Sequence, residues 1–111
     1  MTDARMIYIT APDPEAALRI GRALVERRLA ACANVIPGMR SVYRWKGAVE
    51  EAGEAVLLAK TTADRVEDLI RAVKELHPYE CPCVVVLPIE GGFAPFLAWI
   101  RESVAERGGK G

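Results

Sequence analysis

The spacing of apolar residues along the chain divides it into seven elements. Short runs rich in apolar and β-branched residues predict strands, whereas apolar residues that recur every three or four positions predict helices. The expected strands are residues 6–10, the two extended segments 33–36 and 39–46, residues 55–59 and residues 83–87. The expected helices are residues 14–31, a second that begins at Thr62 or Asp64 and ends at Leu76, and residues 94–105.

Local signals mark the ends of these elements. Asp13-Pro14 is typical of a helix start, because Asp caps free amides and Pro fits the first helical position. Pro37-Gly38 separates the two extended segments, Gly47 marks a turn or bulge, and residues 51–53 predict a second turn. The stretch from residue 32 to residue 62 therefore predicts a long hairpin.

The order of elements defines the fold class. Strand, helix, strand, strand, helix, strand and a short final helix is the order of the split βαβ, or ferredoxin-like, fold. We therefore predict an α+β protein, a ferredoxin-like βαββαβ sandwich with a short C-terminal helix and both main helices on one face of an antiparallel sheet. No linker or repeat divides the sequence, so residues 1–111 are expected to form one domain, with residues 107–111 frayed.

Several predicted strands are apolar on both faces. Residues 84–87 are four consecutive apolar residues, and residues 56–58 repeat the pattern. A sheet with one solvated face alternates apolar and polar residues instead, and two helices cover only one face. The long hairpin would also leave unpaired edges. We therefore predict a homo-oligomer in which subunits pack sheet against sheet and exchange strand pairing.

Charge and composition narrow the class of protein. Fifteen Lys and Arg residues balance fifteen Asp and Glu residues, which argues against nucleic-acid and membrane-surface partners because both need clustered positive charge. No apolar run reaches the roughly 18–20 residues of a membrane span, and the first residues lack the apolar core of a secretory signal. Three cysteines are too few for a disulfide framework and favour the reducing cytoplasm.

The segment His77-Pro78-Tyr79-Glu80-Cys81-Pro82-Cys83 concentrates the reactive side chains. On an extended segment Cys81 and Cys83 point the same way, and thiolates together with the His77 imidazole suit copper or zinc. The alternative is structural: His77 caps the end of a helix, and the cysteines are small buried residues. The segment taken alone favours the structural alternative, and Cys32 is expected to serve packing.

The predicted hairpin carries a second group of candidates. Tyr43, Trp45 and Lys46 lie on its first arm, and the acidic residues Glu50, Glu51 and Glu54 lie on the returning arm. These residues either form cross-strand charge pairs with aromatic packing, or line an aromatic cleft where subunits meet. Lys60, at the end of an apolar strand, is expected to extend its charged end to the surface. The sequence contains no phosphate-binding loop, zinc-protease helix or nucleophile elbow.

Short motifs follow one another in a fixed order from Ile7 to about Arg101. They are Thr10-Ala11-Pro12, Leu29-Ala30-Ala31-Cys32-Ala33-Asn34, Ile36-Pro37-Gly38, Ser41-Val42-Tyr43-Arg44-Trp45-Lys46-Gly47, Lys60-Thr61, His77-Pro78-Tyr79-Glu80-Cys81-Pro82, Leu87-Pro88-Ile89 and Phe96-Leu97-Ala98-Trp99-Ile100. In their joint order and spacing they resemble the CutA family of divalent-cation-tolerance proteins.

The resemblance implies a ferredoxin-like subunit in a tight homotrimer, similar to PII-type signalling trimers, with hairpin strands extending the sheets between subunits. It also implies tolerance of, or response to, copper and other divalent ions, with no established catalytic reaction. His77 matches an imidazole that contributes to the copper site of some members. Ile9 and Leu76 stand where those members have a cysteine and a second histidine, so Cys81 and Cys83 become the candidate substitutes.

These arguments lead to one expected function and one alternative. We expect a cytoplasmic, non-enzymatic homotrimer of divalent-cation tolerance that binds copper, or a similar divalent metal ion, at His77, Cys81 and Cys83. Nucleic acids and membranes are not expected as partners. The alternative is a PII-like sensor of a small molecule or anion. Its intersubunit clefts would be lined by Tyr43, Trp45, Lys60, Tyr79 and Glu80.

Overall fold

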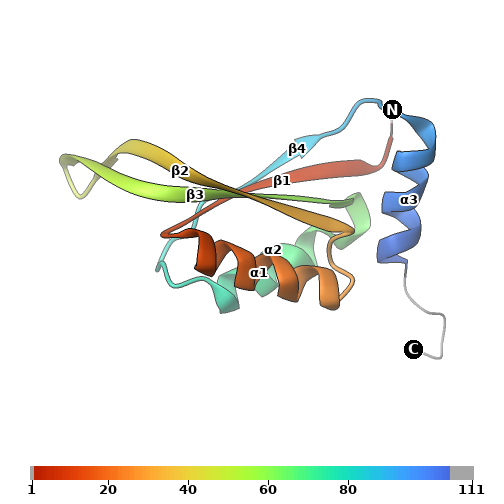
Figure 1. Cartoon of the computed structure of the whole chain (residues 1–111), viewed down its shortest axis with the longest axis horizontal. Helices are drawn as coiled ribbons and strands as arrows, with labels where there is room; N and C mark the ends of the chain where they lie inside the picture. Colours follow the sequence, from red (N-terminus) through yellow and green to blue (C-terminus); the bar gives the residue numbers. More distant parts are fainter. Residues whose placement is uncertain (1, 106–111) are drawn as a thin grey trace.

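The structure is a computed structural model that describes residues 2–105, which form four strands and three α-helices (Figure 1). The strands are β1 (Ala4–Ala11), β2 (Cys32–Trp45), β3 (Ala48–Thr62) and β4 (Val84–Pro88). The helices are α1 (Pro14–Glu26), α2 (Val66–Leu76), which follows a 3₁₀ turn at Ala63–Arg65, and α3 (Ala94–Val104). The predicted order is confirmed, and the prediction for residues 107–111 lies outside the described residues.

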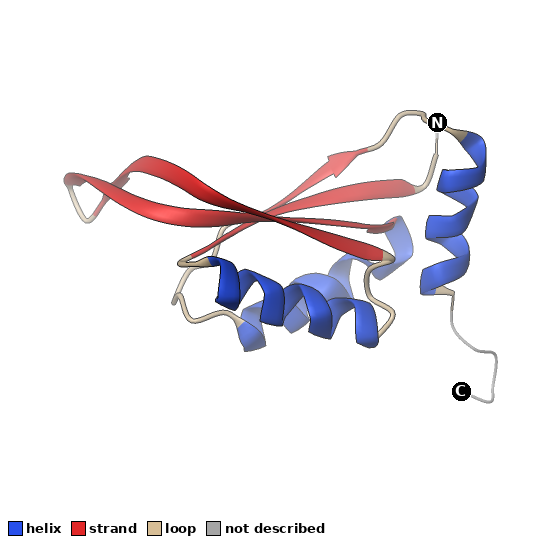
Figure 2. Ribbon diagram, viewed as in Figure 1, coloured by secondary structure: helices blue, strands red, loops and turns tan. Residues whose placement is uncertain are grey.

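The four strands form one antiparallel sheet in the order β2-β3-β1-β4. Helices α1 and α2 lie under one face of this sheet, and α3 stands across one end of it (Figure 2). None of the helices of residues 2–105 covers the opposite face of the sheet (Figure 1). This is the α+β, ferredoxin-like βαββαβ arrangement that the order of elements predicts.

The main core lies between the sheet and helices α1 and α2. Alternate residues of the central strands point into it, among them Ile7 and Ile9 of β1 and Leu57 of β3, which are fully buried. Helix α1 approaches β2 closely at Gly21, where an added Cβ atom would lie 2.9 Å from the Cβ of Ala33. A larger residue at this position would push the helix away from the sheet.

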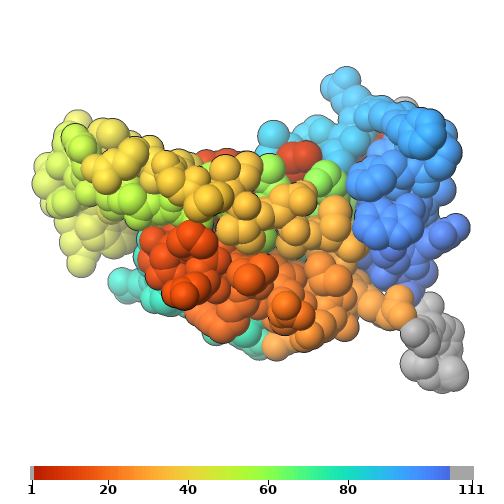
Figure 3. Space-filling view, in the orientation of Figure 1, coloured from red at the N-terminus to blue at the C-terminus, as the bar shows by residue number. Residues whose placement is uncertain are grey.

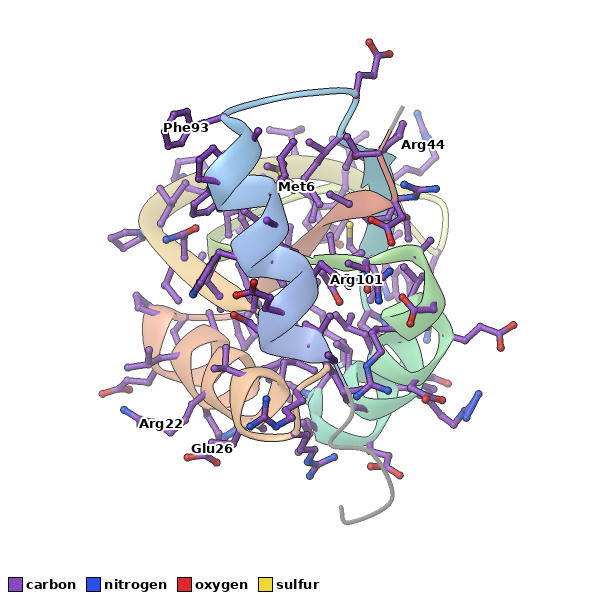
Figure 4. The ribbon with its side chains drawn as sticks, turned by 90° about the vertical axis from the view of Figure 1, so that its right-hand side faces the viewer. Met6, Arg22, Glu26, Arg44, Phe93 and Arg101 are labelled. Carbon is purple, nitrogen blue, oxygen red and sulfur yellow. The ribbon has the colours of Figure 1, made fainter. Side chains whose placement is uncertain are left out.

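A smaller apolar cluster and a charged cluster attach α3 to the rest of the subunit. Ile100 and Val104 are buried in the apolar cluster. Arg101 forms ion pairs with Asp3, which precedes β1, and with Asp64, which precedes α2. In Figure 4, Arg101 lies on the side of α3 that faces the segment before α2. Through this one side chain, helix α3 therefore contacts both the segment before β1 and the segment before α2.

Helix α1 is shorter than predicted, because it ends at Glu26 and does not continue to residue 31. Arg28 adopts a left-handed φ of 59°, and the N–H groups of Leu29 and Ala30 both donate to the carbonyl oxygen of Leu24. Such a reversal closes a helix by satisfying its last free carbonyl groups. The apolar residues that follow enter the core without being helical, which is why the apolar spacing predicted a longer helix.

Strands β2 and β3 form a hairpin that projects well beyond the helices (Figure 3). The hairpin accounts for the elongated shape of the subunit, 48 × 29 × 22 Å. Lys46 and Gly47 form its tight turn with positive φ angles of 51° and 84°, so the turn predicted at Gly47 is confirmed. Pro37-Gly38 does not interrupt β2 but forms a bulge, where the pairing with β3 shifts its register between Ile36 and Met39.

The second turn, predicted at residues 51–53, is wrong. These residues continue β3 and pair in register with residues 40–42 of β2. Gly53 does not end the strand, because its backbone is held in the ladder and the Arg40 guanidinium lies beside it, 3.8 Å from the position of a Cβ atom. Glycine and alanine resemble a turn in composition, but the pairing with β2 keeps this segment extended.

Candidate functional site

A cavity of about 870 Å³ lies between the hairpin, the end of β1 and the segment 77–83 that joins α2 to β4. Four of the five predicted cleft residues line it, and so do both cysteines of the predicted metal site. The lining residues are Tyr8, Thr10, Met39, Arg40, Ser41, Val42, Tyr43, Trp45, Lys46, Glu54, Pro78, Tyr79, Glu80, Cys81 and Cys83. Segments far apart in the sequence therefore build one concave site within a single subunit.

Glu54 is the organising acidic residue of this cavity. Its Oε1 accepts a hydrogen bond of 2.6 Å from the Ser41 hydroxyl, and its Oε2 accepts one of 2.8 Å from the Tyr79 hydroxyl. The first bond crosses the hairpin, and the second joins the hairpin to the segment after α2. Both carboxylate oxygens are thus held in place by hydroxyl donors, which fixes the orientation of the charge.

The environment of Tyr79 keeps its phenol protonated. Burial raises the pKa of Tyr79 well above its ordinary value, and the hydrogen bond to the Glu54 carboxylate raises this pKa further. A phenol that stays protonated remains a hydrogen-bond donor to Glu54 over the whole physiological pH range. Tyr79 therefore acts as a fixed neutral donor on the cavity wall, not as a proton-transfer group.

His77 is held by the backbone on both sides of its ring and is only 7% exposed. The N–H of Tyr79 donates to His77 Nδ1 at 3.1 Å, so Nδ1 carries no proton. His77 Nε2 then carries the proton and donates it to the carbonyl oxygen of Thr10 at 2.7 Å. The predicted position of His77 at the end of α2 is confirmed: it is the C-cap residue, and its backbone N–H donates to the carbonyl oxygen of Val73 at 2.8 Å, while its ring ties this end of the helix to β1.

The cysteines differ in their surroundings, and all three are free thiols. Cys81 is exposed and Cys83 is half-buried, and both line the cavity. Cys32 lies elsewhere, on β2, with its Sγ 4.0 Å from Lys60 Nζ. Within residues 2–105, no three His, Cys, Asp or Glu side chains come together as a metal-binding group. The structure therefore brings Cys81 and Cys83 to one wall but does not complete a metal site with His77.

The basic residues near the cavity already have partners. Arg40 pairs with Glu51 across the hairpin at 3.6 Å, and Lys46 Nζ lies 5.7 Å from the centre of the Trp45 ring. Lys60 does not line the cavity of the single subunit; its Nζ donates to Asn34 Oδ1 at 2.8 Å. The prediction that Lys60 belongs to a cleft between subunits stays a prediction.

Sequence reasoning missed Ser41, Tyr8 and Met39 as members of the site, and it placed Glu54 only among the charged residues of the returning hairpin arm. Tyr8 and Met39 contact each other, with the Tyr8 hydroxyl 3.7 Å from the Met39 sulfur. Alternation along β1 could have identified Tyr8, because it faces away from the buried Ile7. The pair Ser41 and Glu54 had no such signal, since its approach depends on the bulge in β2.

The sequence profile described as CutA1 divalent ion tolerance protein matches residues 5–103. The chain belongs to the CutA1 family. The Thermus thermophilus divalent-cation tolerance protein CutA is 49% identical over 98 residues, which are 88% of this chain and 95% of that protein. The human protein CutA is 44% identical over 95 residues, which are 86% of this chain and 53% of that protein.

Solved structures of CutA proteins share the fold. The crystal structure of CutA from Xylella fastidiosa is similar with a TM-score of 0.91 and 38% identity, covering 94% of this chain and 100% of that one. The resemblance to the CutA family is therefore confirmed, and with it membership of a divalent-cation tolerance family. In residues 2–105, none of the helices combines the length and the apolar character of a membrane span.

Proposed function

We propose that the chain acts in divalent-cation tolerance as a cytoplasmic, non-enzymatic homotrimer that binds copper at the cavity wall. The observation that carries this proposal is the common position of Cys81 and Cys83 on that wall, with the Met39 thioether lining the same cavity. Thiolate and thioether sulfur favour copper(I) over hard cations such as magnesium. The family name supports a relation to divalent ions, and the sulfur donors of this chain support copper.

In this proposal His77 positions the metal-binding segment. Its ring nitrogens are both engaged, so a metal bond at either would replace a hydrogen bond to Thr10 or from Tyr79. The same engagement supports a binding function over catalysis, because this imidazole has no free nitrogen to act as a base for a cysteine nucleophile. Cys81 and Cys83 are therefore the proposed ligands, and the His77 ring holds the segment that carries them.

Titration with copper(I) under reducing conditions, against a competing chromogenic chelator, tests this proposal. The double variant Cys81→Ser/Cys83→Ser should lose at least about tenfold in copper affinity, because serine oxygen is a poor ligand for a soft ion. Cys32→Ser is the matched control, since Cys32 lies outside the cavity, and it should bind as the wild type does. His77→Ala should weaken binding less than the double variant. Equal copper affinity in all four proteins would show that copper does not bind at the cavity wall.

The homotrimer is supported by apolar side chains on the sheet face that none of the described helices covers. Val85 of β4 is 50% exposed in the isolated subunit, and Leu87 on the same face is 43% exposed. Phe93, just before α3, is 76% exposed and projects away from the subunit (Figure 4). Large apolar side chains exposed on one face of a sheet are typical of protein interfaces. Covering it with further copies of the chain would complete the second layer that the sheet lacks.

A second candidate function is the sensing of a small molecule in the same cavity. The observation that favours it is the size of the cavity, about 870 Å³, which lies in the usual range of about 300–1,000 Å³ for ligand pockets. Tyr43, Trp45, Tyr79 and Glu80 supply aromatic walls and a charged rim. A ligand that fills this space should raise the melting temperature of the protein, which a screen of thermal shifts would detect.

A further inference from the structure

The carboxylate of Glu54 faces the cavity, and no cationic side chain of residues 2–105 pairs with it. Within the described part of the chain, its two oxygens accept hydrogen bonds from the neutral hydroxyls of Ser41 and Tyr79. Neither basic residue of the lining pairs with it, since Arg40 is bridged to Glu51 and Lys46 lies over Trp45. A half-buried, ordered carboxylate without a counter-charge favours the approach of a cation.

Aromatic rings line the same cavity. Tyr8, Tyr43, Trp45 and Tyr79 all contribute to its walls. The faces of such rings attract cations, and tryptophan attracts them best. Lys46 already illustrates this at the rim, because its ammonium group lies 5.7 Å from the centre of the Trp45 ring. A cavity that combines aromatic faces with a carboxylate suits a positively charged group that carries an apolar body.

An anionic ligand would find no comparable partner here. Glu54 and Glu80 are the acidic residues of the lining, and the basic ones, Arg40 and Lys46, are already engaged. Lys60, which the sequence suggested for an anion cleft, is bonded to Asn34 outside the lining. An anion would therefore approach the unpaired charge of Glu54 and be repelled by it.

We propose that this cavity binds an organic ammonium ion, with its charged nitrogen beside Glu54 and its carbon body against the aromatic walls. The proposal rests on the second candidate function, the sensing of a small molecule, and names the chemical class of that molecule. Glu54 is the charge-recognition residue, and Ser41 and Tyr79 are positioning residues that hold its carboxylate. All of these groups lie on one subunit.

Calorimetric titration of the wild-type protein with three probes of one carbon skeleton tests the ligand class. The probes are 2-phenylethylammonium, the neutral 2-phenylethanol and the anionic phenylacetate. The ammonium ion should bind at least about tenfold more tightly than the alcohol, because it adds a charged hydrogen bond and a cation–π contact. Phenylacetate should bind more weakly than either. Alcohol affinity equal to that of the ammonium ion, or tighter binding of phenylacetate, would overturn the proposal.

Two pairs of variants locate the recognition. Glu54→Gln should bind 2-phenylethylammonium about tenfold more weakly than the wild type does. Glu67→Gln, an exposed change on α2, should leave this affinity unchanged. Trp45→Leu should also weaken binding, and Trp99→Leu on α3 is its control. Unchanged affinity in Glu54→Gln would sink the proposal. If that variant does not fold, the comparison of the three probes on the wild type still decides.

The outcomes separate this inference from the function on which it rests. Tighter binding of phenylacetate or of the alcohol would refute the ammonium class while leaving the cavity as a small-molecule site. Absence of saturable heat with all three probes at millimolar concentration would refute the ammonium class and count against the sensing function as well. Copper binding at Cys81 and Cys83 is measured separately and depends on neither result.

Discussion

Single side chains connect segments of this subunit that lie far apart in the sequence. The His77 ring joins the end of α2 to Thr10, 67 positions earlier, and the Tyr79 hydroxyl joins the same segment to Glu54 on the hairpin. The cavity wall is therefore built by hydrogen bonds between elements and not by a local motif. Loss of one such bond would loosen the segment that carries Cys81 and Cys83.

The ion pair at Asp64 gives a prediction for acid stability. The hydrogen bond from Thr62 lowers the pKa of Asp64 below its ordinary value of 3.8, and Arg101 lowers it further. Because the pKa is lower in the folded state, the contribution to stability is complete above the unfolded pKa and is lost as pH falls through the folded value. The effect is small, about 0.5 kcal/mol, because the Asp64 side chain is 59% exposed.

Urea unfolding between pH 2 and pH 7 measures this effect. We expect the wild type to be more stable than Asp64→Asn at pH 6, and the difference to disappear below the pKa of Asp64. Glu90→Gln, an exposed change in the loop before α3, serves as the control and should follow the wild type across the range. A difference between wild type and Asp64→Asn that stays constant down to pH 2 would refute the assignment.

At the site, residue types were predictable but their connections were not. Tyr43 and Trp45 follow from strand alternation, which places every second side chain of the hairpin on one face. The hydrogen bond between Ser41 and Glu54 depends on the register shift at the Pro37-Gly38 bulge. The sequence did not reveal this shift. The proline and glycine of that bulge looked like a break between strands. A bulge and a break share the same residue types, and only the partner strand distinguishes them.

Among the elements, the hairpin carries most of the site, and its geometry depends on two special points. The bulge in β2 re-aims the side chains that follow it, and the turn at Lys46 and Gly47 fixes which residues face each other. The turn requires positive φ at both of its residues. Lys46 tolerates this conformation, whereas Gly47 adopts it without steric cost.

Gly47→Ala should lower the free energy of unfolding by about 1 kcal/mol, because a Cβ atom is disfavoured at a φ of 84°. Gly91→Ala is the matched control, since Gly91 has no positive φ and no atom within 4 Å of an added Cβ. Chemical denaturation of both variants checks the prediction. Equal stability of Gly47→Ala and Gly91→Ala would mean that the turn does not constrain the hairpin.

The spacing of apolar residues was sufficient to predict which strands and helices form, but not where all of them end. It identified each strand and helix of residues 2–105. It extended α1 too far, because Leu29 and its neighbours are buried for a tertiary reason after the helix has closed at Arg28. It also interrupted β3 at Gly53, because pairing with β2 is a long-range contact that local composition does not express.

At the scale of the whole molecule, the uncovered face of the sheet leads to a prediction about assembly. Val85 is half-exposed in the single subunit, so aspartate there would cost little in a monomer. In the proposed trimer the same aspartate would be buried without a partner, which is strongly unfavourable. Val85→Asp should therefore abolish assembly.

Light scattering at micromolar concentration checks this prediction. The wild type should have a mass near three times 12.1 kDa, and Val85→Asp should be monomeric or insoluble. Leu18→Asp is the control, because Leu18 is 55% exposed on α1, away from the sheet, and its variant should keep the wild-type mass. A trimeric Val85→Asp with an unchanged melting temperature would contradict an interface on this face.

The contact between Arg101 and Asp3 also bears on the order of events during folding. The two residues are 98 positions apart, so their meeting closes a loop of almost the entire described chain. Such a closure costs chain entropy, and contacts of this separation tend to form late. We expect Arg101→Ala to speed unfolding in stopped-flow experiments while leaving the refolding rate unchanged. Slower refolding with unchanged unfolding would instead place the docking of α3 in the folding nucleus.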